Sequence, residues 1–495
     1  MEILYKSTRG GEENIKASEA ILKGLATDGG LFVPNMLPKL DVSFDSLKDS
    51  TYQDVAYEVM KLFFSDFTEE ELKECINKAY DEKFDTSIIA PLVEADGAYY
   101  LELFHGSTIA FKDMALSILP HLMITSAKKQ HVENEIVILT ATSGDTGKAA
   151  LAGFSNVKGT KIIVFYPKDG VSQIQEKQML TQKGDNTHVV AVYGNFDDAQ
   201  TGVKKIFSNV KLKQLLEQSG YQFSSANSIN IGRLVPQIVY YVYAYVALLR
   251  EKKVKDCGSI NVVVPTGNFG NILAAYYAKE LGVPIRKLLC ASNENKVLFD
   301  FLQSGTYNKK REFILTTSPS MDILVSSNLE RLIYKIAGNR ADLCAKLMEE
   351  LSVNGSYTIS ESMMEELNDF YGGYASEKET ANCINDLYSK TGYVIDTHTA
   401  VASAVYKKYK KDTKDQTPSI IVSTASPFKF TGSVMEALGE TNEMIDDFEK
   451  VEKLSKIANV KIPEAIEDIR KAEILHHTIC EVENMEQEII KFLDI

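Results

Sequence analysis

Short apolar stretches that alternate with helical stretches run through the chain after residue 97, and they constrain the fold more than any other feature. Apolar residues follow one another in these stretches without the polar alternation of a half-exposed strand, which is typical of strands buried on both faces. The stretches are Ile136–Leu139, Lys161–Tyr166, His188–Tyr193, Ile260–Val264, Ile285–Ala291 and Ser419–Val422. Helices are predicted between them, for example over 148–154 and 172–182. We therefore predict an α/β fold with open, mainly parallel sheets flanked by helices.

Three polar loops directly follow predicted strands. They cover Thr140–Gly147, Pro265–Asn271 and Ser423–Pro427. Ligands of open parallel sheets bind beyond the carboxyl ends of the strands. The sequence therefore predicts a ligand site where these loops meet.

The rest of the chain indicates three regions. Residues 1–95 have a mixed, mostly helical pattern, and we predict a small N-terminal domain that covers its neighbour. Residues 96–430 form the predicted α/β region, with two subdomains and a helical insert at about 318–410. Residues 431–495 are charged and amphipathic, which predicts a helical C-terminal part.

Charge and cysteine usage exclude several classes of protein. The 495 residues include 54 Lys and Arg and 68 Asp and Glu, a net charge of -14 that argues against nucleic-acid or anionic-membrane partners. No apolar run approaches the roughly 20 residues of a membrane helix, and no secretory signal is visible. Six scattered cysteines without a C-x-x-C pair predict reduced thiols and a cytoplasmic location. His476, His477 and Cys480 lack a fourth ligand, so we expect no metal.

A single lysine stands in an unusual setting, the stretch F-H-G-S-T-I-A-F-K-D over 104–113. Apolar neighbours of Lys112 remove solvent from its charged form, which lowers the pKa of the amine and makes it a usable nucleophile or base. The alternative interpretation is a surface lysine that follows a short strand over Tyr99–Leu103.

The loop G-N-F-G-N has the character of a phosphate site. Its residues follow a predicted strand and open a helix, so backbone N–H groups and the helix dipole can meet an anion there. They are Gly267, Asn268, Phe269, Gly270 and Asn271. An ordinary strand-to-helix turn is the alternative.

The loop T-S-G-D-T-G over Thr142–Gly147 has the same placement. It is not a P-loop, because Ala149 stands where that motif requires Ser or Thr. The hydroxyls of Thr142, Ser143 and Thr146 predict a nest for a small carboxylate or ring substituent. A capped helix start explains these residues equally well.

Two further turns precede helices. Arg233 follows Asn227–Gly232, and its guanidinium can bind a phosphate bidentately. Taken alone, the residues favour a different interpretation, in which Asn230 caps the helix and Arg233 is exposed. Asp396–Ala400 is interpreted as a helix start capped by Asp396 or Thr397.

Taken together, these motifs resemble the threonine synthase family, in the longer form shared by bacteria and fungi. The resemblance runs nearly end to end and keeps the family's order. It comprises S-T-R-G, D-G-G-L-F-V-P, F-H-G-S-T-I-A-F-K-D, T-A-T-S-G-D-T-G, S-I-N-I-G-R, G-N-F-G-N and S-T-A-S-P-F-K-F. It implies a pyridoxal-phosphate enzyme of fold type II, the tryptophan-synthase-β type.

The resemblance also implies roles for individual residues. Lys112 would be the Schiff-base lysine, and the G-N-F-G-N loop would hold the cofactor phosphate. Thr424 would lie at the pyridine nitrogen, and Asp145 at the cofactor's 3′-oxygen, where relatives of this fold carry asparagine. Arg233, Asn227 and Ser228 would hold the substrate phosphate. Two residues depart from the family, since Ser107 replaces a frequent proline and Ser426 a frequent histidine.

The implied reaction converts O-phospho-L-homoserine and water to L-threonine and phosphate, the last step of threonine biosynthesis. Pyridoxal 5′-phosphate supplies the electron sink, and Lys112 moves protons as acid and base. Two alternatives stay open. One is another lyase of this fold, a serine/threonine dehydratase or a phospho-amino-acid lyase. The other is an inactive binding protein, which the intact motifs argue against. Either a monomer or a homodimer is compatible with the sequence.

Overall fold

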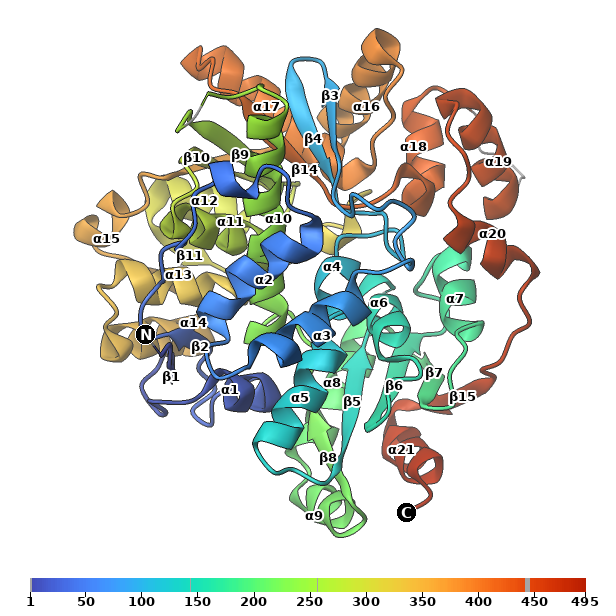
Figure 1. Ribbon diagram of the computed structural model, residues 1–495. Helices are drawn as coiled ribbons and strands as arrows, with labels where there is room; N and C mark the ends of the chain where they lie inside the picture. The colour runs from blue at the N-terminus through green and yellow to red at the C-terminus, as the bar shows by residue number, and fades with distance from the viewer. Residues whose placement is uncertain (1, 143, 256, 441–445) are drawn as a thin grey trace.

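The predicted α/β class is confirmed by the computed structural model, which describes residues 2–142, 144–255, 257–440 and 446–495 (Figure 1). Two larger sheets of mainly parallel strands are joined by helices, and two small antiparallel pairs lie beside them. The small pairs are β1 (Tyr5–Ser7) with β2 (Phe32–Pro34), and β11 (Thr306–Asn308) with β12 (Ser356–Thr358).

The six-stranded sheet has the order β13-β10-β9-β14-β4-β3. Its strands are β13 (Phe370–Tyr374), β10 (Ile285–Ser292), β9 (Ile260–Pro265), β14 (Ser419–Ser423), β4 (Ala98–Glu102) and β3 (Leu92–Ala95). All neighbours are parallel except β3, which runs antiparallel to β4. The predicted helical insert over 318–410 therefore also contributes an edge strand, β13, and strand β12 of a small antiparallel pair.

The five-stranded sheet has the order β15-β7-β6-β5-β8, and every pair of neighbours is parallel. Its strands are β15 (Thr478–Glu481), β7 (Thr187–Tyr193), β6 (Thr160–Pro167), β5 (Glu135–Ala141) and β8 (Tyr221–Ser224). The C-terminal part is thus not purely helical, because β15 completes one edge of this sheet beside β7.

Helix α10 (Ile231–Arg250) runs through the middle of the molecule (Figure 1). Asn230 caps it by accepting a hydrogen bond from the Gly232 N–H at 2.8 Å, as predicted. Its residues from Ile231 to Leu249 are all buried. Among the described residues α10 is the helix long and apolar enough to cross a membrane, which the sequence analysis did not anticipate, but the fold encloses it completely.

The N-terminal region packs directly on this central helix. Helix α2 (Tyr52–Phe63) contacts α10, and Phe63 stacks on Tyr277 of α11 (Gly270–Leu281) with ring centroids 6.2 Å apart. The Leu40 N–H donates to the Leu281 carbonyl at 2.9 Å. One hydrophobic core therefore continues across residue 95, where the sequence predicts a boundary.

The remaining helices cover the sheets and connect their strands. The α-helices are α1 (Ala17–Lys23), α3 (Glu69–Ala79), α4 (Asp113–Leu116), α5 (Leu119–Lys129), α6 (Asp145–Phe154), α7 (Gln173–Leu180), α8 (Phe196–Ser208), α9 (Val210–Gln218), α12 (Val297–Ser304), α13 (Leu329–Ile336), α14 (Ala341–Asn354), α15 (Glu361–Glu365), α16 (Glu377–Thr391), α17 (Thr397–Thr413), α18 (Thr431–Ala437), α19 (Asp447–Ala458), α20 (Glu464–Lys471) and α21 (Met485–Leu493). The short 3₁₀ turns are η1 (Asp45–Leu47), η2 (Pro319–Met321), η3 (Pro427–Phe430) and η4 (Val482–Asn484).

Candidate active site

The loop that carries Lys112 is held against the loop that follows β14. The Phe111 N–H donates to the Thr424 carbonyl at 2.8 Å, and the Ser426 N–H donates to the Ile109 carbonyl at 3.0 Å. These bonds follow from the parallel pairing of β4 with β14, which brings the ends of both strands to one edge of the sheet. Two motifs that lie far apart in the sequence therefore meet at the ends of neighbouring strands.

Lys112 is not a surface lysine. Its side chain is 13% exposed, and its Nζ lies 3.5 Å from Asp145 Oδ2 and 3.3 Å from the Ser320 hydroxyl. Burial lowers the pKa of the Lys112 amine, against the opposing effect of the Asp145 carboxylate. The amine is therefore closer to its neutral, nucleophilic form than a solvated lysine would be.

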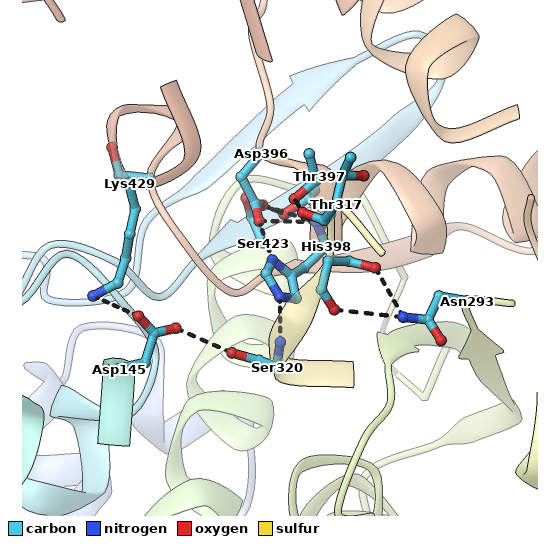
Figure 2. Close-up of polar contacts among 12 residues, drawn as sticks. Asp145, Asn293, Thr317, Ser320, Asp396, Thr397, His398, Ser423 and Lys429 are labelled. Carbon is cyan, nitrogen blue, oxygen red and sulfur yellow. Dashed lines mark hydrogen bonds and ion pairs between the residues drawn. The ribbon is translucent and has the colours of Figure 1, made fainter. Parts of the chain in front are cut away.

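Asp145, at the start of α6, is surrounded by donors (Figure 2). Gln175 Nε2 donates to its Oδ1 at 2.9 Å, Lys429 Nζ lies 3.1 Å from the same oxygen, and the Ser320 hydroxyl donates to Oδ2 at 3.0 Å. Burial alone would raise the pKa of this carboxyl, but the charges of Lys429 and Lys112 outweigh burial and hold the pKa far below its usual value. Asp145 is therefore ionised between two lysines.

The T-S-G-D-T-G loop forms a tight helix start. The Thr142 hydroxyl accepts hydrogen bonds from the Gly144 N–H at 3.0 Å and the Gly147 N–H at 2.9 Å, which leaves its own proton for another partner. Thr146 is half-buried, whereas Ser143 lies outside the described residues. The Thr142 hydroxyl thus binds the backbone of this turn, although the N-cap residue of α6 is Gly144, and a carboxylate nest remains a prediction.

The G-N-F-G-N loop connects β9 to α11 and is held by the turn before α13. The Ser326 hydroxyl donates to the Gly267 carbonyl at 2.7 Å, and the Asn328 N–H donates to the Asn268 carbonyl at 3.0 Å. Phe269 has the left-handed backbone conformation of this loop, with φ 64°. The loop thus turns at Phe269, and its backbone leads directly into the N-terminus of α11.

Two buried donors near this loop lack partners in the described part of the chain. They are Arg233 Nε and Asn271 Nδ2. Arg233 is 3% exposed, its Nη1 donates to the Ala226 carbonyl at 3.0 Å, and burial lowers its pKa to about 10. The interpretation of Arg233 as an exposed residue is therefore wrong. Buried donors without acceptors are costly, so an anionic ligand would satisfy them.

The other residues expected near a substrate phosphate, Asn227 and Ser228, are less buried than Arg233. Asn227 is exposed and Ser228 is half-buried, and the Ser228 carbonyl accepts from Asn328 Nδ2 at 3.3 Å. Of the two departures from the family, Ser426 accepts from the Phe428 N–H at 3.3 Å and caps η3. Ser107 lines a cavity of ≈ 300 Å³ together with Asp113 and His121.

Three contributors to the site were missed by the sequence analysis. Ser320 contacts both Lys112 and Asp145, Lys429 pairs with Asp145, and His398 Nε2 accepts from the Ser320 N–H at 3.2 Å (Figure 2). His398 Nδ1 in turn lies 2.8 Å from Oδ2 of Asp396, which caps α17 as predicted. Lys429 could have been found, because it is the cation within S-T-A-S-P-F-K-F. Ser320 has no distinctive local pattern.

Comparison with known families supports one class of enzyme for this fold and this buried lysine. The family model described as pyridoxal-phosphate dependent enzyme matches residues 89–426, which include both large sheets apart from β15. The chain is therefore a member of the pyridoxal-phosphate-dependent enzymes. Models for the threonine synthase N terminus and the threonine synthase C-terminal region match residues 4–80 and 399–478. The chain belongs to the threonine synthase family.

Individual relatives agree with this assignment. The chain is 37% identical over 474 residues to threonine synthase from Schizosaccharomyces pombe, an alignment that covers 89% of this chain and 90% of that protein. It is 42% identical over 434 residues to threonine synthase-like 1 from Homo sapiens, which covers 85% of this chain but spans only 58% of that longer protein. The crystal structure of pyridoxal-phosphate-bound threonine synthase from Brucella melitensis has a TM-score of 0.86 at 32% identity, and 100% of both chains is covered.

Proposed function

We propose that this protein converts O-phospho-L-homoserine and water to L-threonine and phosphate. The observation that carries the proposal is Arg233, a buried guanidinium with an unpartnered Nε and no carboxylate in salt-bridge contact among the described residues. A buried cation of this kind requires an anion, and a phosphorylated substrate supplies one. Membership of the threonine synthase family supports the same reaction.

The residues present fit pyridoxal phosphate. Lys112 offers a buried amine of lowered pKa, and the unpartnered Nδ2 belongs to Asn271, the last residue of the G-N-F-G-N motif, on the first turn of α11. We assign the cofactor phosphate to the backbone of Gly267, Asn268, Phe269 and Gly270 with Asn271, and the ring to Lys112, Asp145 and Thr424. The cofactor would supply an electron sink for the carbanion chemistry of the substrate.

The chain's own side chains would bind the substrate and move its protons. Thr142, Ser143 and Thr146 are assigned to the substrate carboxylate, and Arg233, Asn227 and Ser228 to its phosphate. Lys112 Nζ would carry protons between substrate carbons as general base and acid. The low exposure of Lys112 keeps bulk water away from this transfer.

The decisive test compares a phosphorylated with an unphosphorylated substrate, in the wild-type protein and in one variant of Arg233. The wild-type protein is expected to release phosphate and form threonine from O-phospho-L-homoserine. Because lysine cannot reproduce the bidentate guanidinium contact, Arg233→Lys is expected to raise KM for this substrate about 10- to 100-fold. Any slow deamination of serine or threonine should stay unchanged. The measurement is steady-state kinetics on both substrate types.

Arg340→Lys is the matched control, since Arg340 is exposed and pairs only locally with Asp342. Equal losses on phosphorylated and unphosphorylated substrates in Arg233→Lys would mean that Arg233 is structural, and a serine/threonine dehydratase would then be favoured. A cytoplasmic location and a monomeric or homodimeric state remain predictions from the sequence.

A further inference from the structure

Three charged side chains are buried together at the centre of the site. Asp145 lies between Lys429 Nζ, 3.1 Å from Oδ1, and Lys112 Nζ, 3.5 Å from Oδ2. The Lys429 side chain is 1% exposed, which makes it even less accessible than Lys112. The proposed reaction assigns a task to Lys112 but leaves this second lysine without one.

Lys429 is anchored to the same loop that carries Lys112. Its Nζ donates to the Thr108 carbonyl at 2.8 Å. Thr108 is itself fixed by Asp113, which accepts from the Thr108 N–H at 2.8 Å and from the Thr108 hydroxyl at 2.6 Å. The ammonium group of Lys429 therefore has a defined position beside the Asp145 carboxylate.

The neighbouring carboxylate and the chemistry expected of Lys112 favour opposite protonation states of its amine. A buried carboxylate at this distance favours the ammonium form of Lys112, but bond formation to a carbonyl requires the neutral amine. A second ammonium on the same carboxylate offsets that pull, so Asp145 stays paired when Lys112 loses its proton. We propose that Lys429 is a positioning residue whose ammonium group, paired with Asp145, offsets the effect of that carboxylate on Lys112 and thereby favours the neutral form of the Lys112 amine, which can bond to the cofactor. This inference rests on the cofactor role proposed for Lys112.

The remaining charged groups around this cluster are few in the described structure. Lys112 faces Asp145, Lys429 and Arg233, and Asp145 additionally faces His398. Lys429 itself also faces Asp113 and Lys148. Burial is the largest cause of the lowered pKa of Lys112, Asp145 opposes it, and Lys429 and Arg233 reinforce it. Of these cations, Lys429 is the one in direct contact with Asp145 besides Lys112 itself.

The test measures the pKa of Lys112 without relying on activity. The apoprotein is acylated competitively between about pH 6 and about pH 10, and the labelling rate of the Lys112 peptide is followed by mass spectrometry. Lys429→Met is expected to raise the labelling midpoint by at least about one pH unit, a tenfold change in proton affinity. Asp145→Asn should lower the midpoint, and the double variant Lys429→Met/Asp145→Asn should return close to wild type. With pyridoxal phosphate added, the pH midpoint of the visible absorption band should move in the same directions.

The control is Lys148→Met, which removes another buried lysine, whose Nζ donates to Gln182 at 2.6 Å. Lys148 is not among the groups that shift the Lys112 pKa, so this variant should leave the Lys112 midpoint unchanged. An unshifted midpoint in folded Lys429→Met overturns the proposal. If Lys429→Met does not fold, the double variant decides. A Lys112 labelling midpoint in the double variant that differs from the wild-type midpoint by more than about one pH unit then overturns the proposal. If wild type binds no cofactor, the proposed function fails, and the labelling result still decides the role of Lys429.

Discussion

Gly267 has no room for a side chain, and the obstacle is the protein's own backbone. A Cβ at this position would lie 2.6 Å from the Ser320 carbonyl oxygen and 3.4 Å from Met321 Cα. The sequence analysis attributed this glycine to the approach of a phosphate. The structure adds that η2 packs against the same loop from a segment far along the chain.

Gly267→Ala is therefore expected to lower the thermal midpoint of unfolding and to weaken cofactor affinity together, because the loop and η2 must separate. Equilibrium titration with pyridoxal phosphate and thermal denaturation of the apoprotein give the two quantities. Gly432→Ala is the control, since a Cβ there meets no described atom within 4 Å. A normal affinity and an unchanged midpoint in Gly267→Ala would show that the loop tolerates a side chain.

His105 gives the chain a pH-dependent contribution to stability. Burial lowers the pKa of its imidazole, but Asp85, with its carboxylate 2.5 Å from Nδ1, and Glu102, 2.9 Å from Nε2, outweigh burial and raise the pKa to about 9. The folded-state pKa thus exceeds the unfolded value of about 6.5. The stabilisation is complete below about pH 6.5 and is lost as the pH rises through about 9.

His105→Gln is expected to lower the free energy of unfolding by about 1–2 kcal/mol at about pH 6, allowing for screening of the exposed Asp85. The difference from wild type should shrink toward zero by about pH 10. Urea denaturation at the two pH values measures it. A difference independent of pH would contradict the ion-pair explanation.

Local sequence context was sufficient to predict Lys112 as a site residue, but it was not sufficient to predict the partners of Lys112. The apolar residues that predicted a buried Lys112 are its immediate neighbours in the sequence, whereas Ser320 and Asp145 are 175 residues apart and meet only in the folded chain. For the same reason, the contact of His398 with Ser320 could not be predicted from the sequence. The helix cap at Asp396 could be predicted, because it depends on local residues.

At the level of elements, strands that form continuous apolar runs were predicted within one or two residues. Four strands of the two larger sheets were missed, namely β3, β8, β13 and β15. Two of them have especially weak patterns: β13 reads F-Y-G-G-Y and β15 reads T-I-C-E. Glycine and glutamate are depleted in strands, so their pairing depends on a neighbouring strand rather than on intrinsic preference. Helix α10 was predicted for a different reason, a polar turn followed by a long apolar run.

The N-terminus of α17 supports η2 across the site. His398 accepts from the Ser320 N–H and approaches Asp396, so its removal leaves a half-buried N–H and a buried carboxylate each without one partner. We expect His398→Ala to destabilise the apoprotein by about 1–3 kcal/mol and to weaken cofactor affinity, since η2 loses its support. Thermal denaturation and cofactor titration test this, with the exposed His131→Ala as control. Unchanged stability would mean that water replaces the imidazole.

Across the whole molecule, Arg331 joins three segments that come from distant parts of the chain. Its Nε donates to the Phe32 carbonyl at 2.9 Å, its Nη2 to the Ile229 carbonyl at 2.5 Å, and its Nη1 to Asn328. Arg331 is 1% exposed, and burial lowers its pKa to about 10. The N-terminal region is therefore connected to the turn that precedes Arg233.

Arg331→Lys cannot make all three contacts, since an ammonium is a single point of charge. We expect a loss of about 3 kcal/mol or more in unfolding free energy, because buried acceptors lose their donors. KM for O-phospho-L-homoserine should also rise, because the turn at Ile229 shifts. Urea denaturation and steady-state kinetics measure both effects, against the exposed Arg340→Lys. A stability loss with an unchanged KM would mean that the N-terminal region does not affect substrate binding.

The position of β14 has a consequence for how the chain folds during synthesis. Apart from edge strand β15, the five-stranded sheet comes from one continuous stretch, 135–224, and can pair as soon as that stretch is made. The six-stranded sheet cannot, because β14 lies between β9 and β4 and is synthesised long after both. Until residue 423 has left the ribosome, two strand edges have no native neighbour, which makes the nascent chain prone to aggregation and its final closure slow.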